Sequence, residues 1–445
     1  MAAIRQVIPG VSETDKKAVT LLGSPLDAGG LQNAISKCSH KVRLICSRVQ
    51  DLDAHWALFF LSRYTSAPRL SHLMRTSPTY QQPTELQNID NLVRETLVIC
   101  TNVQLSDSSW IQASMPLRFG GLGVRGVHDL ALPCYISSLH ASQVLIKEIL
   151  APQPETAYRV PITLNRVVGE FQVRYPDAHL PSGDEASKQK QWDTISCQDS
   201  FQNLLEHSNQ VHRARLLAAK EPYSGAWLGA VPLPALGLHL DDSTVRVSVA
   251  LRVGATICEP HACRCGQRVD SLGHHGLACR YSAGRLPRHA NINDVVKRAL
   301  ATLGIPSLLE PVGLDGRDSR RPDGVTVFPY HQGKSLAWDG TCVDTYCDSS
   351  IINCSISPGS AAAAAEENKR EKYLALTDRY LFEPVAVETS GVIGPSTMKF
   401  ISRLGKRLSI QTGNKQETAW LFQRISMAVV RGNSASITAT GCLST

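Results

Sequence analysis

The 445-residue sequence has no apolar run that approaches the roughly 20 residues needed to cross a bilayer. We therefore expect no membrane span and no membrane partner. A secretory signal is also missing, because Asp15, Lys16 and Lys17 stand where such a signal needs an apolar core. The expected location is intracellular, nuclear if the source is eukaryotic, and the protein is not expected to be secreted.

A large excess of one charge is absent as well. The formal net charge is only +7, and most of the excess lies after Cys258. A hydrophobic fraction of 43% and a charged fraction of 19% are typical of a globular protein that is neither disordered nor membrane-spanning. The length allows two to four domains. The modest basic excess favours a polyanionic partner without requiring one.

Cysteine, in contrast, is plentiful, with thirteen residues. Without an export signal these are expected to be thiols or metal ligands rather than a disulfide framework. The densest cluster lies between residues 258 and 279, where thiolates and imidazoles suit a tetrahedral, structural Zn²⁺. Buried thiols without a metal are the alternative. The predicted ligands are Cys263, Cys265, His275 and Cys279, with Cys258 and His274 as alternates.

Apolar residues recur at steps of three and four from Leu31 to Leu52, which predicts a long amphipathic helix. Further helical patterns make residues 1–150 mostly α-helical. The stretch from about Pro152 to Gln191 is rich in Pro, Ser and charge, which favours a linker with some helix. Asp241, Asp242 or Ser243 can cap a short helix that runs to Val253.

The sequence after residue 320 predicts a β-hairpin that carries two acidic residues. Val325–Phe328 is rich in strand-forming residues, His331–Gly333 has turn composition, and Ser335–Tyr346 alternates like a returning strand.

A three-residue turn with Gly333 in the left-handed position would place Asp339 across from Val325. Asp323 and Asp339 would then share one face of the sheet and could bind one metal ion. A register slip of one residue would put the two carboxylates on opposite faces.

The order of several short motifs resembles the C-terminal part of non-LTR retrotransposon reverse transcriptase polyproteins. Segments similar to the region after the polymerase palm are Leu21–Leu26, Arg63-Tyr64, Pro68–Leu70 and Pro116–Gly123. Cys-x-Cys-Gly with His-x3-Cys, then Arg288-His289 and Arg321-Pro322-Asp323, resemble the zinc knuckle and the restriction-enzyme-like PD-(D/E)XK endonuclease of such elements.

This resemblance covers most of the chain and implies a multidomain protein. The expected parts are a helical, thumb-like region at 1–150, a linker and helical region at 151–257, a zinc knuckle at 258–290 and an α/β endonuclease domain at 291–445. The family's aromatic-x-Asp-Asp polymerase box is missing ahead of Leu22, and Leu240-Asp241-Asp242 is interpreted as a helix cap. Reverse transcription by this chain alone is therefore not expected.

Restriction-like nucleases usually place a lysine two residues after the second acid, where this chain has Thr341. The predicted helix Ser360–Leu376 supplies two substitutes. Lys369 lies at the centre of its apolar face and is favoured by geometry, whereas Lys372 is favoured by the family's Lys-Tyr pair. Either could reach Asp339, or both could extend to solvent.

The resemblance implies Mg²⁺ or Mn²⁺ bound by Asp323 and Asp339, and no small-molecule cofactor. Glu310 is a candidate third carboxylate, and Asp344, Asp348 and Glu388 are of second rank. The expected partner is DNA, with the element's RNA as an alternative. Basic residues predicted to contact nucleic acid, unless they are merely solvated, are Arg285, Arg288, His289, Lys399, Arg403, Lys406 and Arg407.

Two functions follow from these patterns. The first is a metal-dependent endonuclease that nicks DNA to start target-primed reverse transcription. The second is a catalytically inactive, nucleic-acid-binding remnant or domesticated protein, which Thr341 favours.

Overall fold

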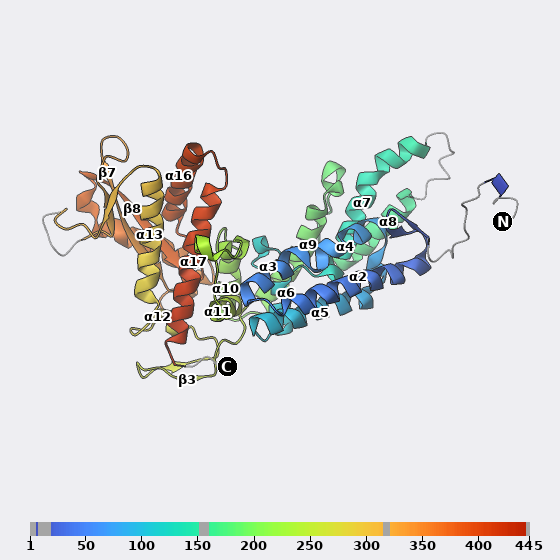
Figure 1. Ribbon diagram of the computed structural model, residues 1–445, viewed down its shortest axis with the longest axis horizontal. Coiled ribbons are helices and arrows are strands. Elements are labelled where there is room, and N and C mark those ends of the chain that lie inside the picture. The colour runs from blue at the N-terminus through green and yellow to red at the C-terminus, as the bar shows by residue number, and fades with distance from the viewer. Residues whose placement is uncertain (1–5, 8–18, 151–159, 315–320, 442–445) are drawn as a thin grey trace. The chain divides into compact units, whose positions relative to one another are not determined.

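The computed structural model describes residues 6–7, 19–150, 160–314 and 321–441 (Figure 1). Asp15, Lys16 and Lys17 lie outside these residues. The chain is mostly helical with a small mixed sheet. It divides into two compact units, of which unit 1 comprises residues 1–52, 60–97 and 124–202, and unit 2 comprises residues 53–59, 98–123 and 203–445. Within the described ranges, no helix combines the length and apolarity that a membrane span requires.

Unit 1 is built from helices and one short hairpin. Its helix α2 (Ala28–Val49) confirms the predicted amphipathic helix and begins at Asp27, whose carboxylate accepts a hydrogen bond from the Gly29 N–H. The other elements, some of which extend past the unit, are β1 (Thr20–Leu21), β2 (Ser24–Pro25), α3 (Ala54–Tyr64), α4 (Ser66–Thr76), η2 (Thr79–Gln81), α5 (Pro83–Thr101), α7 (Val127–Leu150), α8 (Val160–Arg174), η5 (Gly183–Ser187) and α9 (Gln189–Glu206).

Helix α8 lies in the stretch from about Pro152 to Gln191, whose content of Pro, Ser and charged residues predicts a linker with some helix. Residues 151–159 lie outside the described residues, but residues 160–174 form a regular helix with a buried face. Phe171 packs edge-on against Trp192, with ring centroids 5.1 Å apart. The expected helix is thus present, and its apolar face belongs to a core with α7 and α9.

Unit 2 contains the remaining helices and the sheet. Helix α11 (Asp242–Val253) begins at Asp241, whose carboxylate accepts from the Thr244 N–H at 2.8 Å, so Asp241-Asp242 is a helix cap as predicted. The other helical elements are α6 (Asp107–Ala113), η3 (Leu117–Phe119), α10 (Gln210–Lys220), η6 (Ala226–Gly229), η7 (Pro234–Leu236), α12 (His275–Ala278), α13 (Arg285–Thr302), α14 (Ile351–Cys354), α15 (Ser360–Lys372), η8 (Leu374–Leu376), α16 (Pro395–Thr412) and α17 (Glu417–Thr438).

The main sheet of unit 2 has the strand order β5-β6-β7-β8. Strands β5 (Ser307–Leu309), β6 (Gly324–Thr326) and β7 (Ser335–Val343) are antiparallel, and β8 (Tyr380–Glu388) runs parallel to β7. A further short pair, β3 (His261–Ala262) and β4 (Arg268–Val269), lies in the cysteine-rich segment.

Strand β7 is buried on both faces because helices cover each one. Trp338 faces α13, where its indole N–H donates to Asn293 at 3.2 Å, and it joins a core with α16 and α17. Figure 1 shows these three helices beside the strands. Asp339, the next residue, points to the opposite face and meets α15.

The hairpin differs from its predicted register by two residues. Gly333 is left-handed as predicted, but the tight turn has Gln332 and Gly333 at its centre, with φ values of 47° and 73°. Val325 pairs with Ala337 rather than with Asp339. A two-residue difference preserves the face of a strand residue. Asp323, however, is a bend residue before β6, and the observed pairing begins at Gly324 with Trp338.

Candidate functional site

Asp339 lies at the centre of the acidic site, buried on the face of β7 that α15 covers. The Lys369 ammonium forms an ion pair with its Oδ1 atom. The Tyr373 hydroxyl donates to Oδ2 at 2.6 Å and also lies 2.7 Å from the Arg321 carbonyl oxygen. Since Lys369 and Tyr373 are four residues apart, one face of α15 and its C-cap delivers both groups to the carboxylate.

Asp323 precedes β6 and has a different set of partners. Its Oδ2 atom accepts from the Gly340 N–H at 2.6 Å and lies 2.8 Å from His289 Nε2. The same His289 nitrogen lies 3.2 Å from the Gly340 carbonyl oxygen. Asp323 is thus held against the residue that follows Asp339, on the side to which α13 contributes His289.

The two carboxylates therefore have different basic partners, Lys369 for Asp339 and His289 for Asp323. The hydrogen bond with Asp323 is the largest influence on His289 and raises the pKa of its imidazole. Burial acts to raise the pKa of Asp323, but the hydrogen bond and charge of His289 outweigh it and hold that pKa below its ordinary value. Asp323 is consequently an anion at neutral pH.

The remaining predicted catalytic residues lie elsewhere. Lys372 is exposed, with its ammonium 4.6 Å from the centre of the Tyr373 ring rather than on Asp339. Glu310 has a side chain that is 67% exposed and pairs with Arg321 at 2.8 Å. Neither residue is brought to the acid pair, because each already has a surface contact that directs it away.

The three second-rank acids are also outside the acid pair. Glu388 is fully buried and accepts from Thr345 and Ser390 at 3.0 and 3.1 Å. Asp344 accepts from the Thr389 hydroxyl at 2.8 Å, and Asp348 is exposed. These contacts give Glu388 and Asp344 a role in fixing loops.

Two of the seven predicted nucleic-acid contacts have other roles. Arg288 is only 2% exposed and donates to Asn433 at 2.6 Å, so a phosphate cannot reach it. His289 pairs with Asp323, although its side chain is 39% exposed. The spacing of basic residues does not predict that α13 directs these two side chains to Asn433 and Asp323.

The other five basic residues lie at the surface. Arg285, Lys399 and Lys406 are exposed. Arg403 forms an ion pair with Glu383, and Arg407 lies over the Tyr330 ring at 4.7 Å. A basic surface on α16 is thus present, with part of its charge compensated.

Four of the cysteine-cluster residues converge on one point. The ligand atoms of Cys263, Cys265, His275 and Cys279 all lie within 4.8 Å of one another. The Cys263 and Cys279 sulfurs are 3.7 Å apart, close to the edge of about 3.8 Å that a tetrahedron with Zn–S bonds of about 2.3 Å requires. The donor set and its geometry therefore fit a metal ion such as structural zinc.

Both alternates for this cluster point away from it. The Cys258 thiol donates to the Asp270 carbonyl oxygen at 3.3 Å. The His274 ring stacks on Tyr346, with centroids 4.0 Å apart and planes 5° apart. In the part of the chain that the structure describes, the Cys₃His set is the one group of three or more His, Cys, Asp or Glu side chains close enough to share an ion.

Sequence reasoning missed two members of the acidic site. Tyr373 could have been found, since it follows Lys369 by one helical turn and shares its apolar face. The contact of His289 with Asp323 could not, because it joins residues 34 positions apart and depends on how α13 packs against the sheet.

The chain matches no protein-family model and no curated protein.

Proposed function

We propose that the C-terminal part of unit 2 is a metal-dependent endonuclease that nicks DNA, derived from a retrotransposon protein. The observation that carries this proposal is the ion pair of Lys369 with buried Asp339, next to Gly340, whose N–H donates to Asp323. Placing a half-buried lysine against a buried carboxylate is costly, which supports a functional role for this pair.

Lys369, Tyr373 and His289 would each have a separate role in the reaction. Lys369 would orient the attacking water or stabilise the negative charge that develops on the phosphate. Tyr373 holds the Asp339 carboxylate through its hydroxyl, and also contacts the Arg321 backbone, so it fixes the distance between the two strands. His289 positions Asp323 in the same way from α13.

A divalent cation is part of this proposal, and the donor chemistry is suited to it. Asp323 and Asp339 would hold Mg²⁺ or Mn²⁺, because hard cations prefer carboxylate oxygens. When bound, such an ion lowers the pKa of a coordinated water and offsets charge on the leaving oxygen. Positively charged residues of α16, including Lys399 and Lys406, would lie along the DNA backbone.

Nicking of supercoiled plasmid in Mg²⁺ or Mn²⁺ tests the proposal. Asp323→Asn and Asp339→Asn should each reduce the rate by about 10²–10³-fold, whereas the exposed Asp378→Asn should not. Zinc content and thermal unfolding of each variant check that the fold survives. Equal rates in all three variants would refute the assignment of the two acids.

The second candidate is a nucleic-acid-binding protein that no longer cleaves. It is favoured by one observation, namely that Lys369 and His289 already contact the two carboxylates that a metal ion would need. Binding of duplex DNA together with no nicking by the native chain in either metal would support it.

A further inference from the structure

A small polar cavity in unit 2 lies apart from both sites described above. Its walls come from α10, α11 and α17, the segment after β7 and the turn after β8. The volume is about 40 Å³. Since one water needs roughly 10–15 Å³, the cavity has room for a few waters or one small ion, but not for a nucleotide.

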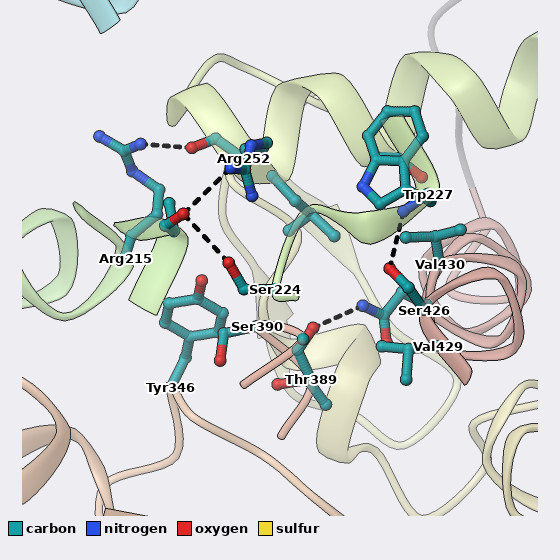
Figure 2. A pocket seen from close by; sticks show the side chains of 15 residues that line it. Arg215, Ser224, Trp227, Arg252, Tyr346, Thr389, Ser390, Ser426, Val429 and Val430 are labelled. Atoms are coloured by element: carbon teal, nitrogen blue, oxygen red, sulfur yellow. Dashed lines mark hydrogen bonds between the residues drawn. The ribbon is translucent and has the colours of Figure 1, made fainter. Parts of the chain in front are cut away.

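Two buried arginines line this cavity (Figure 2). Arg215 and Arg252 are 7% and 8% exposed. Each guanidinium group packs closely against a glycine. A Cβ added to Gly254 would come within 2.6 Å of Arg215, and one added to Gly225 would come within 2.7 Å of Arg252. The fold thus makes specific room for two positive charges in its interior.

Neither arginine has a carboxylate partner among the described residues. Arg215 donates to Gln112 and to the Arg252 carbonyl oxygen, the latter at 2.6 Å. Arg252 donates to the carbonyl oxygens of Gly121 and Ala219 at 3.1 and 3.0 Å. Burial lowers the pKa of both guanidinium groups to about 10, so both remain charged at neutral pH. Carbonyl dipoles compensate these charges only in part.

The buried carboxylate of Glu388 belongs to a different network. Its oxygens accept from Thr345 and Ser390, and from the Ala362 N–H at the start of α15 at 3.3 Å. These donors stabilise its charge without an arginine. The excess positive charge at the cavity is therefore not cancelled by Glu388 through direct contact.

A hydroxyl is also available at the cavity. The Tyr346 hydroxyl has no hydrogen-bond partner within the described part of the chain, while its ring is fixed by stacking on His274. Figure 2 shows this hydroxyl directed toward Ser224, on the side where both arginines lie. An unpaired O–H donor and two guanidinium charges at one cavity are the kinds of group that bind an anion.

We propose that this cavity binds a small inorganic anion of about the size of chloride, held by Arg215, Arg252 and the Tyr346 hydroxyl. The anion would join α10, α11 and the end of β7, and would bind the folded chain alone. Such binding stabilises the folded state by an amount that grows with the logarithm of the anion concentration above its Kd. This proposal is independent of the proposed nuclease function.

Thermal unfolding of the full chain at constant ionic strength provides the test. Chloride or bromide is titrated against gluconate, which is too large for the cavity. We expect Tm to rise with the logarithm of either halide concentration, by about 2–4 °C over the titration. Tyr346→Phe should weaken the apparent halide affinity about tenfold, whereas Tyr223→Phe, which retains its stacking on Phe422, should leave it unchanged.

Comparing Tyr346→Phe with Tyr223→Phe also distinguishes binding at the site from general salt effects. General salt effects act equally on the native chain and on both variants. Arg252→Met can prevent folding, so a crystal grown in bromide supplies a second measurement that needs no variant. An anomalous peak beside Arg252 and Tyr346 would support the proposal. Equal halide responses of the native chain and Tyr346→Phe, or a water-filled cavity in bromide, would overturn it, and so would stabilisation by phosphate alone.

Discussion

The two lysines of α15 differ in whether they contact the candidate nuclease site. They lie three positions apart, but Lys369 pairs with buried Asp339 while Lys372 is exposed beside the Tyr373 ring. Position on the helix therefore decides which lysine can act on a phosphate bound at the acid pair.

We expect Lys369→Met to lower the plasmid-nicking rate by about 10²–10³-fold, because it removes a positive charge at the reacting phosphate. Lys372→Met should change the rate by less than about twofold. The measurement compares the nicking rates of the native chain and both variants at saturating Mn²⁺, and unfolding curves check that each variant is folded. A larger loss in Lys372→Met than in Lys369→Met would contradict the site geometry.

His55 makes the stability of unit 2 depend on pH. Its buried ring accepts the Leu240 N–H at Nδ1, 3.0 Å away, and burial lowers its pKa to about 4. Below about pH 6.5 the unfolded chain binds a proton that the folded chain excludes, so stability should fall as pH decreases from 6.5 to 4, by about 2–3 kcal/mol.

Denaturant unfolding at several pH values measures this dependence. His55→Asn keeps an acceptor in place of Nδ1 but has no proton to bind in this range. The variant should show a flatter profile over pH 4–6.5. Parallel profiles for the two proteins would show that His55 does not control this pH range.

Among the elements, the β6–β7 pair sets the register that brings Asp323 beside Gly340, the residue after Asp339. Gly324 lies across from Trp338, and a Cβ at Gly324 would come within 2.1 Å of the indole ring. The glycine thus lets the tryptophan cover β6 while Asp323 remains beside Gly340.

We expect Gly324→Ala to lower the free energy of unfolding by about 2–4 kcal/mol, because the added methyl group displaces a buried ring. Gly169→Ala is the matched control in helix α8, where a Cβ would have open space. That substitution should raise stability by roughly 0.5–1 kcal/mol. Similar effects of the two substitutions would show that the packing of Trp338 does not require a glycine at position 324.

The cysteine-rich segment is the second element with a clear prediction. We expect one zinc ion per chain, and Cys279→Ser should lose it because a thiolate ligand is replaced by a weak one. Cys258→Ser should retain the metal, since Cys258 contacts a carbonyl oxygen instead. Metal analysis after dialysis measures both, and loss of zinc from Cys258→Ser would contradict the ligand set.

The features that could be predicted from sequence depend on interactions between residues close together along the chain. Local patterns predicted α2, the cap of α11 and the ligand spacing of the Cys₃His group. The shared face of Asp323 and Asp339 stays a prediction, because the side-chain partner of Asp323 comes from α13 and those of Asp339 come from α15 and its C-cap. The contacts of Arg288 and His289 could not be predicted, because they depend on distant β7 and α17. Some helix was expected around α8, but its packing against α7 and α9 was not, because that packing also depends on distant contacts.

At the scale of the whole molecule, unit 2 is assembled from three separate stretches of the chain. Residues 98–123 contribute Gln112, which donates to the carbonyl oxygens of Gly120 and Arg252 at 3.0 Å each. The domain limits expected from the sequence begin the nuclease at residue 291 and stay a prediction. The contacts of Gln112 show that the surrounding core begins much earlier.

A fragment of residues 203–445 should therefore be less protected than the full chain. Without Gln112 and Gly121, the buried groups of Arg215 and Arg252 lose acceptors, which is strongly destabilising. Hydrogen exchange should be at least about tenfold faster in α10 and α11 of the fragment. Identical exchange in both proteins would show that residues 98–123 are dispensable for this core.

The position of α17 has a consequence for biosynthesis. This last helix packs against α11, α12, α13 and α16, so it touches nearly every layer of unit 2. A ribosome releases it only after all its neighbours have been made. The nascent polypeptide therefore keeps those apolar surfaces uncovered until α17 has been made, which leaves the late folding intermediate prone to aggregation.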